Sequence, residues 1–271
     1  MKTFAFLLAV VFWALPVRAQ ELPIFDTHMH YSQGAWDAYG PRQILEKMDK
    51  AAIPRALVSS TPDDGTMKLF KIAPQRIVPG FRPYRNSNDL ARWYETPDLL
   101  PYTKARLASG HHKVFGEVHL FLPGNLDTPE MAEYLKLAVD RGLILHPHSD
   151  AAVVEALFKK RPNLKILWAH AGFSEPPEVV GRLLDQYPNL WAELSYRAHH
   201  IFPDDDLDPQ WKDLLIRHAD RFTIGSDTWE VDRWHDYRNL IGEHREWLGL
   251  LPADVAEKIA YRNAEALFEK R

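Results

Sequence analysis

Residues 143–172 read LILHPHSDAAVVEALFKKRPNLKILWAHAG, two short apolar runs separated by a helical pattern. LILHPHS and LKILWAHAG have the length and apolar content of buried strands. Between them, DAAVVEALFKKRP places apolar residues three and four positions apart, which is typical of a helix packed on one face. A strand, a helix and a second strand in this order favour two parallel strands joined by a crossover helix. This stretch therefore predicts a parallel α/β fold.

The same alternation extends in both directions along the chain. Strand-like runs cover residues 22–30, 55–61, 76–84, 112–122, 143–149, 164–172, 190–196 and 222–228. Helical patterns lie between many of them, at residues 41–51, 127–142, 150–162, 177–188 and 208–221, and two or more further helices are expected within residues 233–268. Eight such runs over about 250 residues predict a (β/α)8 TIM barrel formed as a single domain by residues 20–271. A doubly wound open sheet is the alternative, but the sequence has no G-x-G-x-x-G phosphate loop.

The first 19 residues differ from the rest. Lys2 precedes an apolar run of about 14 residues, shorter than the roughly 20 that cross a membrane. Val17 and Ala19 then occupy the small-residue positions of a cleavage site. We interpret residues 1–19 as a signal peptide, with an uncleaved anchor as the alternative. The mature protein is expected to be secreted, into a bacterial periplasm or the extracellular space, without a stable membrane anchor.

The amino-acid composition excludes several kinds of site and partner. The 271 residues include no cysteine, which excludes disulfides, thiolate metal sites and a cysteine nucleophile. A formal net charge of −4 gives no sign of a nucleic-acid surface. A small molecule is therefore the expected partner, and a homo-oligomer is compatible with the sequence.

Polar side chains recur where the predicted strands end. In FDTHMHY (residues 25–31), Asp26, His28 and His30 alternate with Phe25, Thr27 and Met29, so strand geometry predicts that the two sets face opposite ways. Later runs add imidazole or carboxylate groups at Glu117, His146, His148, His170 and Asp227. A TIM barrel gathers such strand ends at one face, and a divalent cation would compensate the buried carboxylates. The pattern predicts a metal site with nitrogen and oxygen ligands, which suit zinc.

The motifs DTHMH, FGEVH, LHPHS, WAHAG, IGSD and RNAEALF resemble those of the metal-dependent amidohydrolase superfamily, especially its amidohydrolase-related branch, also called amidohydrolase family 2. The resemblance spans essentially all of residues 20–271 and implies a barrel enzyme holding one or two divalent ions, commonly zinc. It implies His28, His30, His146 and Asp227 as ligands. It also implies that His170 binds a second metal or polarises the substrate or the attacking water. Asp227 would be the catalytic acid and base, assisted by His170.

Two departures from the family pattern leave the metal number open. Glu117 stands where many two-metal relatives have a lysine, and a glutamate there can ligate or bridge metals. Both His146 and His148 are available on the fifth run. His146 is preferred because it directly follows LIL, which leaves His148 to support the ligands or face the substrate. Asp26 is expected to provide hydrogen bonds beneath the ligands.

Other candidates have structural alternatives. Arg82, Arg85 and Arg197 could bind a substrate carboxylate, because the guanidinium matches its geometry, but surface arginines are common. Glu193 is expected to pair with one of these arginines. His119 could face the site or be a hydrogen-bonded structural residue. Trp168 and Trp229 flank ligand positions and could shape the pocket, but packing is their expected role. His111 and His199 are expected in loops.

The leading functional hypothesis is a hydrolase acting through a metal-activated water on a small-molecule lactone, ester or amide. The resemblance also implies a zinc-dependent decarboxylase of an aromatic or enoic acid as the main alternative. A two-metal phosphoesterase is third, because of Glu117. A periplasmic metal- or ligand-binding barrel without catalysis is the alternative outside enzymes, although Asp227 favours catalysis.

Overall fold

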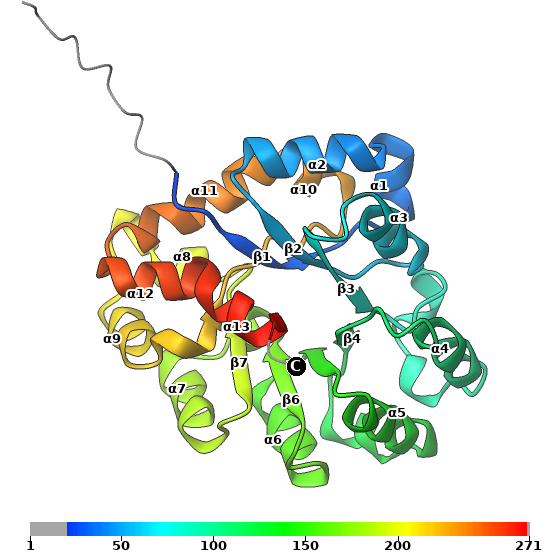
Figure 1. The fold of residues 1–271 in the computed structure, drawn as a ribbon. Coiled ribbons are helices and arrows are strands. Elements are labelled where there is room, and N and C mark those ends of the chain that lie inside the picture. The colour runs from blue at the N-terminus through cyan, green and yellow to red at the C-terminus, as the bar shows by residue number, and fades with distance from the viewer. Residues whose placement is uncertain (1–20, 270–271) are drawn as a thin grey trace, which may run out of the picture.

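The computed structural model describes residues 21–269, which form a closed barrel of eight parallel strands in chain order (Figure 1). Each predicted run contains one strand. The strands are β1 (Phe25–Met29), β2 (Arg55–Val58), β3 (Ile77–Phe81), β4 (Val114–His119), β5 (Ile144–His148), β6 (Lys165–Trp168), β7 (Leu190–Glu193) and β8 (Phe222–Thr223). The barrel closes where Thr27 N–H donates to the Ile224 carbonyl at 2.8 Å, beside a parallel bridge between Asp26 and Ile224. The predicted (β/α)8 barrel is confirmed, whereas the predicted signal peptide lies outside the described residues.

Most helices surround the strands on the outside of the barrel, and α13 lies across one end of it (Figure 1). The helices are α1 (Gln33–Ala38), α2 (Pro41–Lys50), α3 (Asp64–Ile72), α4 (Leu99–Leu107), α5 (Pro129–Asp140), α6 (Ala151–Lys160), α7 (Pro177–Gln186), α8 (Ala198–Ile201), α9 (Pro209–Arg217), α10 (Val231–His235), α11 (Tyr237–Leu248), α12 (Ala253–Glu257) and α13 (Asn263–Glu269). Helices α10 to α13 confirm the helical tail expected within residues 233–268. Helix α4 and 3₁₀ turns at Ser87–Asp89 and Trp93–Glu95 occupy the stretch between β3 and β4.

An apolar layer fills the end of the barrel where the strands begin. One side chain from each of the first six strands contributes, namely Phe25, Leu57, Val78, Val114, Ile144 and Leu167. Ala264 of α13 packs into the same layer, and Figure 1 shows α13 across this end of the barrel. Burial of this layer leaves the carboxyl ends of the strands as the place for polar side chains, as is usual in this fold.

Strand β1 does not keep the simple alternation that the sequence predicts. Its register shifts between Asp26 and Met29, so Phe25 belongs to the interior apolar layer instead of facing the helices. Asp26 lies apart from His28 and His30, and its carboxylate meets Tyr237 of α11. The expectation that Asp26 shares a face with the two histidines is therefore wrong, because the irregularity separates them.

Asp26 nevertheless supports the site, as expected, through the backbone. Its Oδ1 accepts the N–H groups of His28 and Ser226 at 3.0 and 3.1 Å. Its Oδ2 accepts the hydroxyls of Ser226 and Tyr237 at 2.6 and 2.9 Å. The carboxylate is fully buried and joins the first strand to the segment that follows the last strand.

In the part of the chain that the structure describes, no helix is both long and apolar enough to cross a membrane.

Replacing Asp26 with Ala should lower the free energy of unfolding by about 3 kcal/mol or more, because four buried donors lose their acceptor. Denaturant unfolding of the purified protein measures the change, with the exposed Asp37→Ala as the matched control. Equal stability of the two variants would contradict the assigned role of Asp26.

Candidate metal centre

Four buried side chains converge at the carboxyl end of the barrel. His28 and His30 come from β1 and the residue after it, Glu117 comes from β4, and Asp227 follows β8. The Nε2 atoms of the two histidines are 3.2 Å apart. Asp227 Oδ1 and Glu117 Oε2 lie 3.1 and 3.3 Å from His30 Nε2, and each lies 3.6 Å from His28 Nε2. We call these four residues the first ligand group.

Glu117 connects this group to a second one. Its other oxygen, Oε1, lies 2.8 Å from His148 Nδ1 and 3.4 Å from His170 Nε2. The two imidazole nitrogens are 3.2 Å apart. Glu117, His148 and His170 therefore form the second ligand group, and one carboxylate offers an oxygen to each group. This arrangement suits one or two cations.

The donor atoms fit a cation better than they fit one another. Asp227 Oδ1 is buried and accepts no hydrogen bond within the described residues. His30 Nδ1–H donates to the Ser59 carbonyl at 2.6 Å, so its Nε2 carries a lone pair directed at the carboxylate oxygens. Several lone pairs facing one another in a buried site are unfavourable without a positive charge between them. The first ligand group thus has the composition and tautomeric state of a divalent-metal site.

Glu193, at the end of β7, orients the histidines of both groups. Its Oε2 accepts His28 Nδ1–H at 2.8 Å and the Ser195 hydroxyl at 2.9 Å. Ser195 Oγ in turn accepts His170 Nδ1–H at 2.8 Å, so both rings present Nε2 to the site. Gly225 leaves room for this network, since a Cβ there would lie 2.2 Å from Glu193 Oε1.

The predicted pairing of Glu193 with an arginine is wrong, because its carboxylate is occupied by these groups. Sequence reasoning also missed Ser195. For Glu193, the available sequence signal was its position at a strand end, which is the same signal that selected Glu117 and Asp227.

The geometry favours His148 over His146 as the β5 residue of the second ligand group. Both side chains point into the barrel, but they lie at different depths. His146 is closer to the apolar layer, with its ring 4.5 Å from that of His28, and both its nitrogens are buried without a hydrogen-bond partner in residues 21–269. His146 can form a third cluster with His28 and Glu193, but His28 Nδ1 already donates to Glu193 there. Because the nitrogens of His146 are without partners in this part of the chain, as Asp227 Oδ1 is, the ligand role expected for His146 stays a prediction.

The backbone is strained at two of these residues. His170 and Asp227 adopt left-handed conformations, with φ of 56° and 46°. Such conformations are costly outside glycine and tend to occur at functional sites, where surrounding contacts hold them. Two hydrogen bonds hold Asp227 in this conformation. Its backbone N–H donates to the His28 carbonyl at 2.6 Å, and Arg233 Nε–H donates to the Asp227 carbonyl at 2.6 Å.

Carboxylates dominate the electrostatics of the centre. Burial alone would lower the pKa of His28, but Asp227, Glu193 and Glu117 raise it well above 6.5. Burial would raise the pKa of Glu193, yet His28 lowers it to about 2. Asp227 likewise has a lowered pKa, because His28 and His30 outweigh the effect of burial. Without a metal, a proton on His28 thus supplies part of the positive charge that the carboxylates require.

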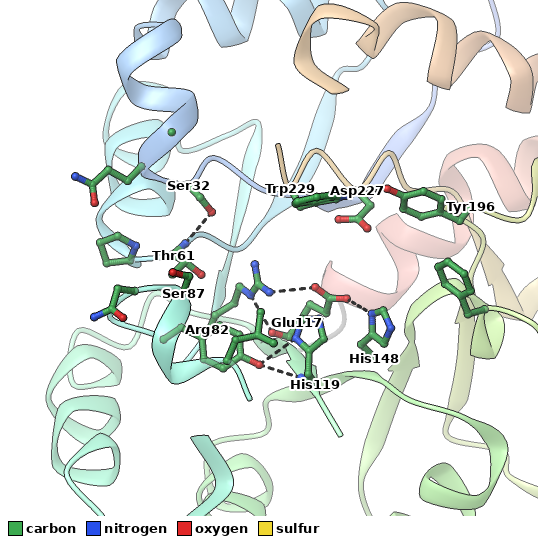
Figure 2. A pocket seen from close by; sticks show the side chains of 17 residues that line it. Ser32, Thr61, Arg82, Ser87, Glu117, His119, His148, Tyr196, Asp227 and Trp229 are labelled. Carbon is green, nitrogen blue, oxygen red and sulfur yellow. Dashed lines mark hydrogen bonds and ion pairs between the residues drawn. The ribbon is translucent and has the colours of Figure 1, made fainter. Parts of the chain in front are cut away.

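A cavity of about 630 Å³ opens over the centre. Figure 2 shows Asp227, Trp229 and Tyr196 on one side and Arg82, Glu117 and His119 on the other. Trp229 and Phe173, about half exposed, belong to its lining. Further lining comes from polar or small residues of the β1, β2 and β3 loops, including Ser32, Thr61, Asn86 and Ser87.

Of the three predicted substrate-binding arginines, Arg82 lines this cavity and two do not. Arg82 donates from Nε to the Glu117 carbonyl at 3.1 Å and from Nη2 to Glu117 Oε2 at 3.3 Å. Arg85 is held by both oxygens of Asp89. Arg197 is buried over Trp211 and donates to the carbonyls of Phe173 and Glu175. The last two guanidiniums therefore brace loops near the site.

Among the remaining candidates, the expected packing role is confirmed for Trp168 and is wrong for Trp229, which is about half exposed. Trp168 is fully buried and donates to the Ser149 carbonyl, whereas Trp229 lines the cavity. His111 lies in a loop, as expected, whereas His199 lies in α8, so the expected loop position is wrong for His199. Neither belongs to the cavity lining. His119 lines the cavity, hydrogen-bonded to Tyr84.

The barrel and the buried histidine–carboxylate centre define a class of barrel enzymes with a candidate divalent-metal site. The family described as Amidohydrolase matches residues 104–270, more than half of the chain. The protein belongs to this amidohydrolase family and is a hydrolase of the amidohydrolase superfamily. The match includes Glu117, His148, His170 and Asp227, while His28 and His30 precede it.

Solved structures with the same fold include three from bacteria. A probable 2-pyrone-4,6-dicarboxylic acid hydrolase from Acinetobacter baumannii is 14% identical, with a TM-score of 0.60 over 92% of this chain and 100% of that one. An amidohydrolase from Burkholderia multivorans with bound zinc is 14% identical, with a TM-score of 0.61 over the same shares. A TatD homologue from Escherichia coli is 16% identical, with a TM-score of 0.60 over 93% and 100%. No curated protein sequence matches the chain.

Replacing Glu193 with Gln should weaken metal binding about 10- to 100-fold, because His28 Nδ1 loses its anionic acceptor. Competition with a chromogenic chelator measures the affinity, and the exposed Glu178→Gln is the control. If Glu193→Gln retained the wild-type affinity, Glu193 would not be orienting His28.

Metal binding to the metal-free protein should release about one proton near neutral pH, because the metal displaces the proton held by His28. Affinity should therefore decrease as the pH falls and the proton competes for His28 Nε2. Calorimetric titration with zinc in two buffers of different ionisation enthalpy counts the released protons. Identical binding enthalpies in the two buffers would contradict this account.

Proposed function

We propose that the protein is a metal-dependent hydrolase of small-molecule lactones, esters or amides. The observation that carries the proposal is the convergence of His28, His30, Glu117 and Asp227 beneath an open cavity. The family membership supports the reaction class, and the cavity volume lies in the range common for small ligands. Zinc is the preferred cation, since imidazole and carboxylate ligands suit it.

A bound divalent cation would supply Lewis-acid chemistry, polarising the scissile carbonyl and lowering the pKa of water towards about 7. Asp227 lines the cavity and has a lowered pKa, so its carboxylate is ionised and can accept a proton from the attacking water. As the bond between the carbonyl carbon and its leaving group breaks, Asp227 passes that proton to the leaving oxygen or nitrogen. Glu193 keeps the Nε2 lone pairs of His28 and His170 directed at the site throughout.

A two-metal phosphoesterase is the second candidate, favoured by the two oxygens of Glu117 facing separate ligand groups. In such enzymes, two cations stabilise the attacking and leaving oxygens together. Assays of lactone, aryl-ester, anilide and phosphodiester cleavage by the zinc-loaded protein, combined with elemental analysis, separate the candidates. Two zinc ions per chain with phosphodiester cleavage alone would replace the leading proposal with the second.

We further propose that residues 1–19 direct export to the periplasm or extracellular space. A small-molecule substrate is the proposed partner, in keeping with the size of the cavity. Comparison of the N-terminal residue of the expressed and exported protein tests the export. An exported protein that retains Met1 would contradict cleavage.

Replacing Asp227 with Asn should reduce hydrolysis by about 10²- to 10⁴-fold, because the amide cannot accept the proton from water. Asparagine tolerates the left-handed backbone found there, so the fold should persist. Initial rates are measured together with metal content and circular dichroism, with the exposed Asp232→Asn as the control. Unchanged turnover in Asp227→Asn at full metal content would exclude its role as the base.

A further inference from the structure

His119 is the last residue of β4, two positions beyond Glu117, and it is held on several sides. Its backbone N–H donates to the Tyr84 hydroxyl at 2.9 Å. Its carbonyl accepts Trp93 Nε1–H at 2.8 Å. Its ring stacks on that of His148, with centroids 4.7 Å apart and planes 23° from parallel. The imidazole therefore has a defined position in the cavity wall, next to the second ligand group.

Tyr84 also defines which ring nitrogen carries the hydrogen. The Tyr84 oxygen lies 3.3 Å from His119 Nδ1, and the hydroxyl accepts the His119 backbone N–H at the same time. Within the described residues, Nδ1 is the acceptor in reach of the Tyr84 hydroxyl hydrogen. A neutral imidazole that accepts at Nδ1 carries its hydrogen at Nε2. The Tyr84 hydroxyl thus selects the Nε2–H tautomer.

Nε2 is the part of His119 that the protein leaves without a partner. Across residues 21–269, its ring makes its hydrogen bond through Nδ1, and none is formed by Nε2. Because His119 and Tyr84 both line the cavity, a donor at Nε2 is available to a bound molecule (Figure 2). A fixed donor beside a hydrolytic centre can bind an oxygen of the substrate.

We propose that His119 Nε2–H binds an oxygen of the substrate next to the scissile carbonyl, and that Tyr84 is the positioning residue for this donor. This inference rests on the proposed hydrolase and adds a requirement for the substrate. The substrate must present an oxygen acceptor towards β4, such as the ring or carbonyl oxygen of a lactone or ester. Glu117 and His148 of the second ligand group line the same cavity as His119, so the donor and these two residues face one bound molecule together.

Two variants separate the donor from the stacked ring. His119→Phe keeps an aromatic ring against His148 but removes the donor, whereas His119→Gln keeps an N–H near the position of Nε2 and loses the ring. With dihydrocoumarin as the probe lactone, kcat/KM should fall roughly 10- to 100-fold in His119→Phe and by less in His119→Gln. The exposed His111→Phe is the control, and zinc content is measured for every variant. Wild-type activity in His119→Phe, or equal losses in both variants at full zinc content, would overturn the inference.

Nitrogen-15 spectra of the histidine rings provide a readout independent of turnover. The His119 signals, assigned by their loss in His119→Gln, should show hydrogen on Nε2 in the wild type and a mixture of tautomers in Tyr84→Phe. Adding dihydrocoumarin should shift the Nε2 signal. Hydrogen on Nδ1 in the wild type, or no shift on adding the lactone, would overturn the inference.

The two proposals can fail separately. Absence of hydrolysis by the zinc-loaded wild type across all probes would remove the proposed function, while the ring spectra with dihydrocoumarin would still decide whether His119 is a donor to bound oxygen. Hydrolysis by the wild type with no effect of His119→Phe would preserve the proposed function and remove the role of His119.

Discussion

The hydrogen bond from His28 Nδ1–H to Glu193 Oε2 is the interaction on which the centre depends. It directs His28 Nε2 towards Asp227 and Glu117, and through Ser195 the same carboxylate controls His170. Because the pair is buried, neither group can exchange its partner for water without a large cost. Glu193 therefore links the two ligand groups through the Nδ1 atoms of His28 and, by way of Ser195, His170. Glu117 links the same groups by belonging to both.

The strands and the loops provide different parts of the site. Side chains at the strand ends provide the candidate ligands, and the apolar layer with Ala264 of α13 fills the other end of the barrel. The loops after β1, β2, β3 and β8 provide much of the cavity wall, including Ser32, Thr61, Asn86 and Trp229. Changes in these loops can alter which molecules enter while the buried centre stays the same, which is a general property of this fold.

Sequence patterns predicted the barrel, its eight strands and the gathering of His28, His30, Glu117, His170 and Asp227, because each depends on local periodicity or on which strand end carries a polar residue. They failed where the outcome depends on depth or on tertiary partners. His146 and His148 share a face, and only the geometry of the closed barrel shows which one reaches Glu117. Asp26 lies off the predicted face because of a local irregularity in β1. Arg197 donates hydrogen bonds to loop carbonyls, and no spacing rule identifies such partners.

The seam between β1 and β8 brings together residues from opposite ends of the chain. In the sequence, strands β2 to β8 all lie between His28 and Asp227, so the first ligand group is incomplete until the final strand has closed the structure. Any cation held by both residues binds the closed barrel far better than partly folded forms, and its binding energy adds to the stability of the finished fold alone. Metal binding would then distinguish complete chains from truncated ones, since a chain truncated before β8 would lack Asp227 and with it one residue of the first ligand group.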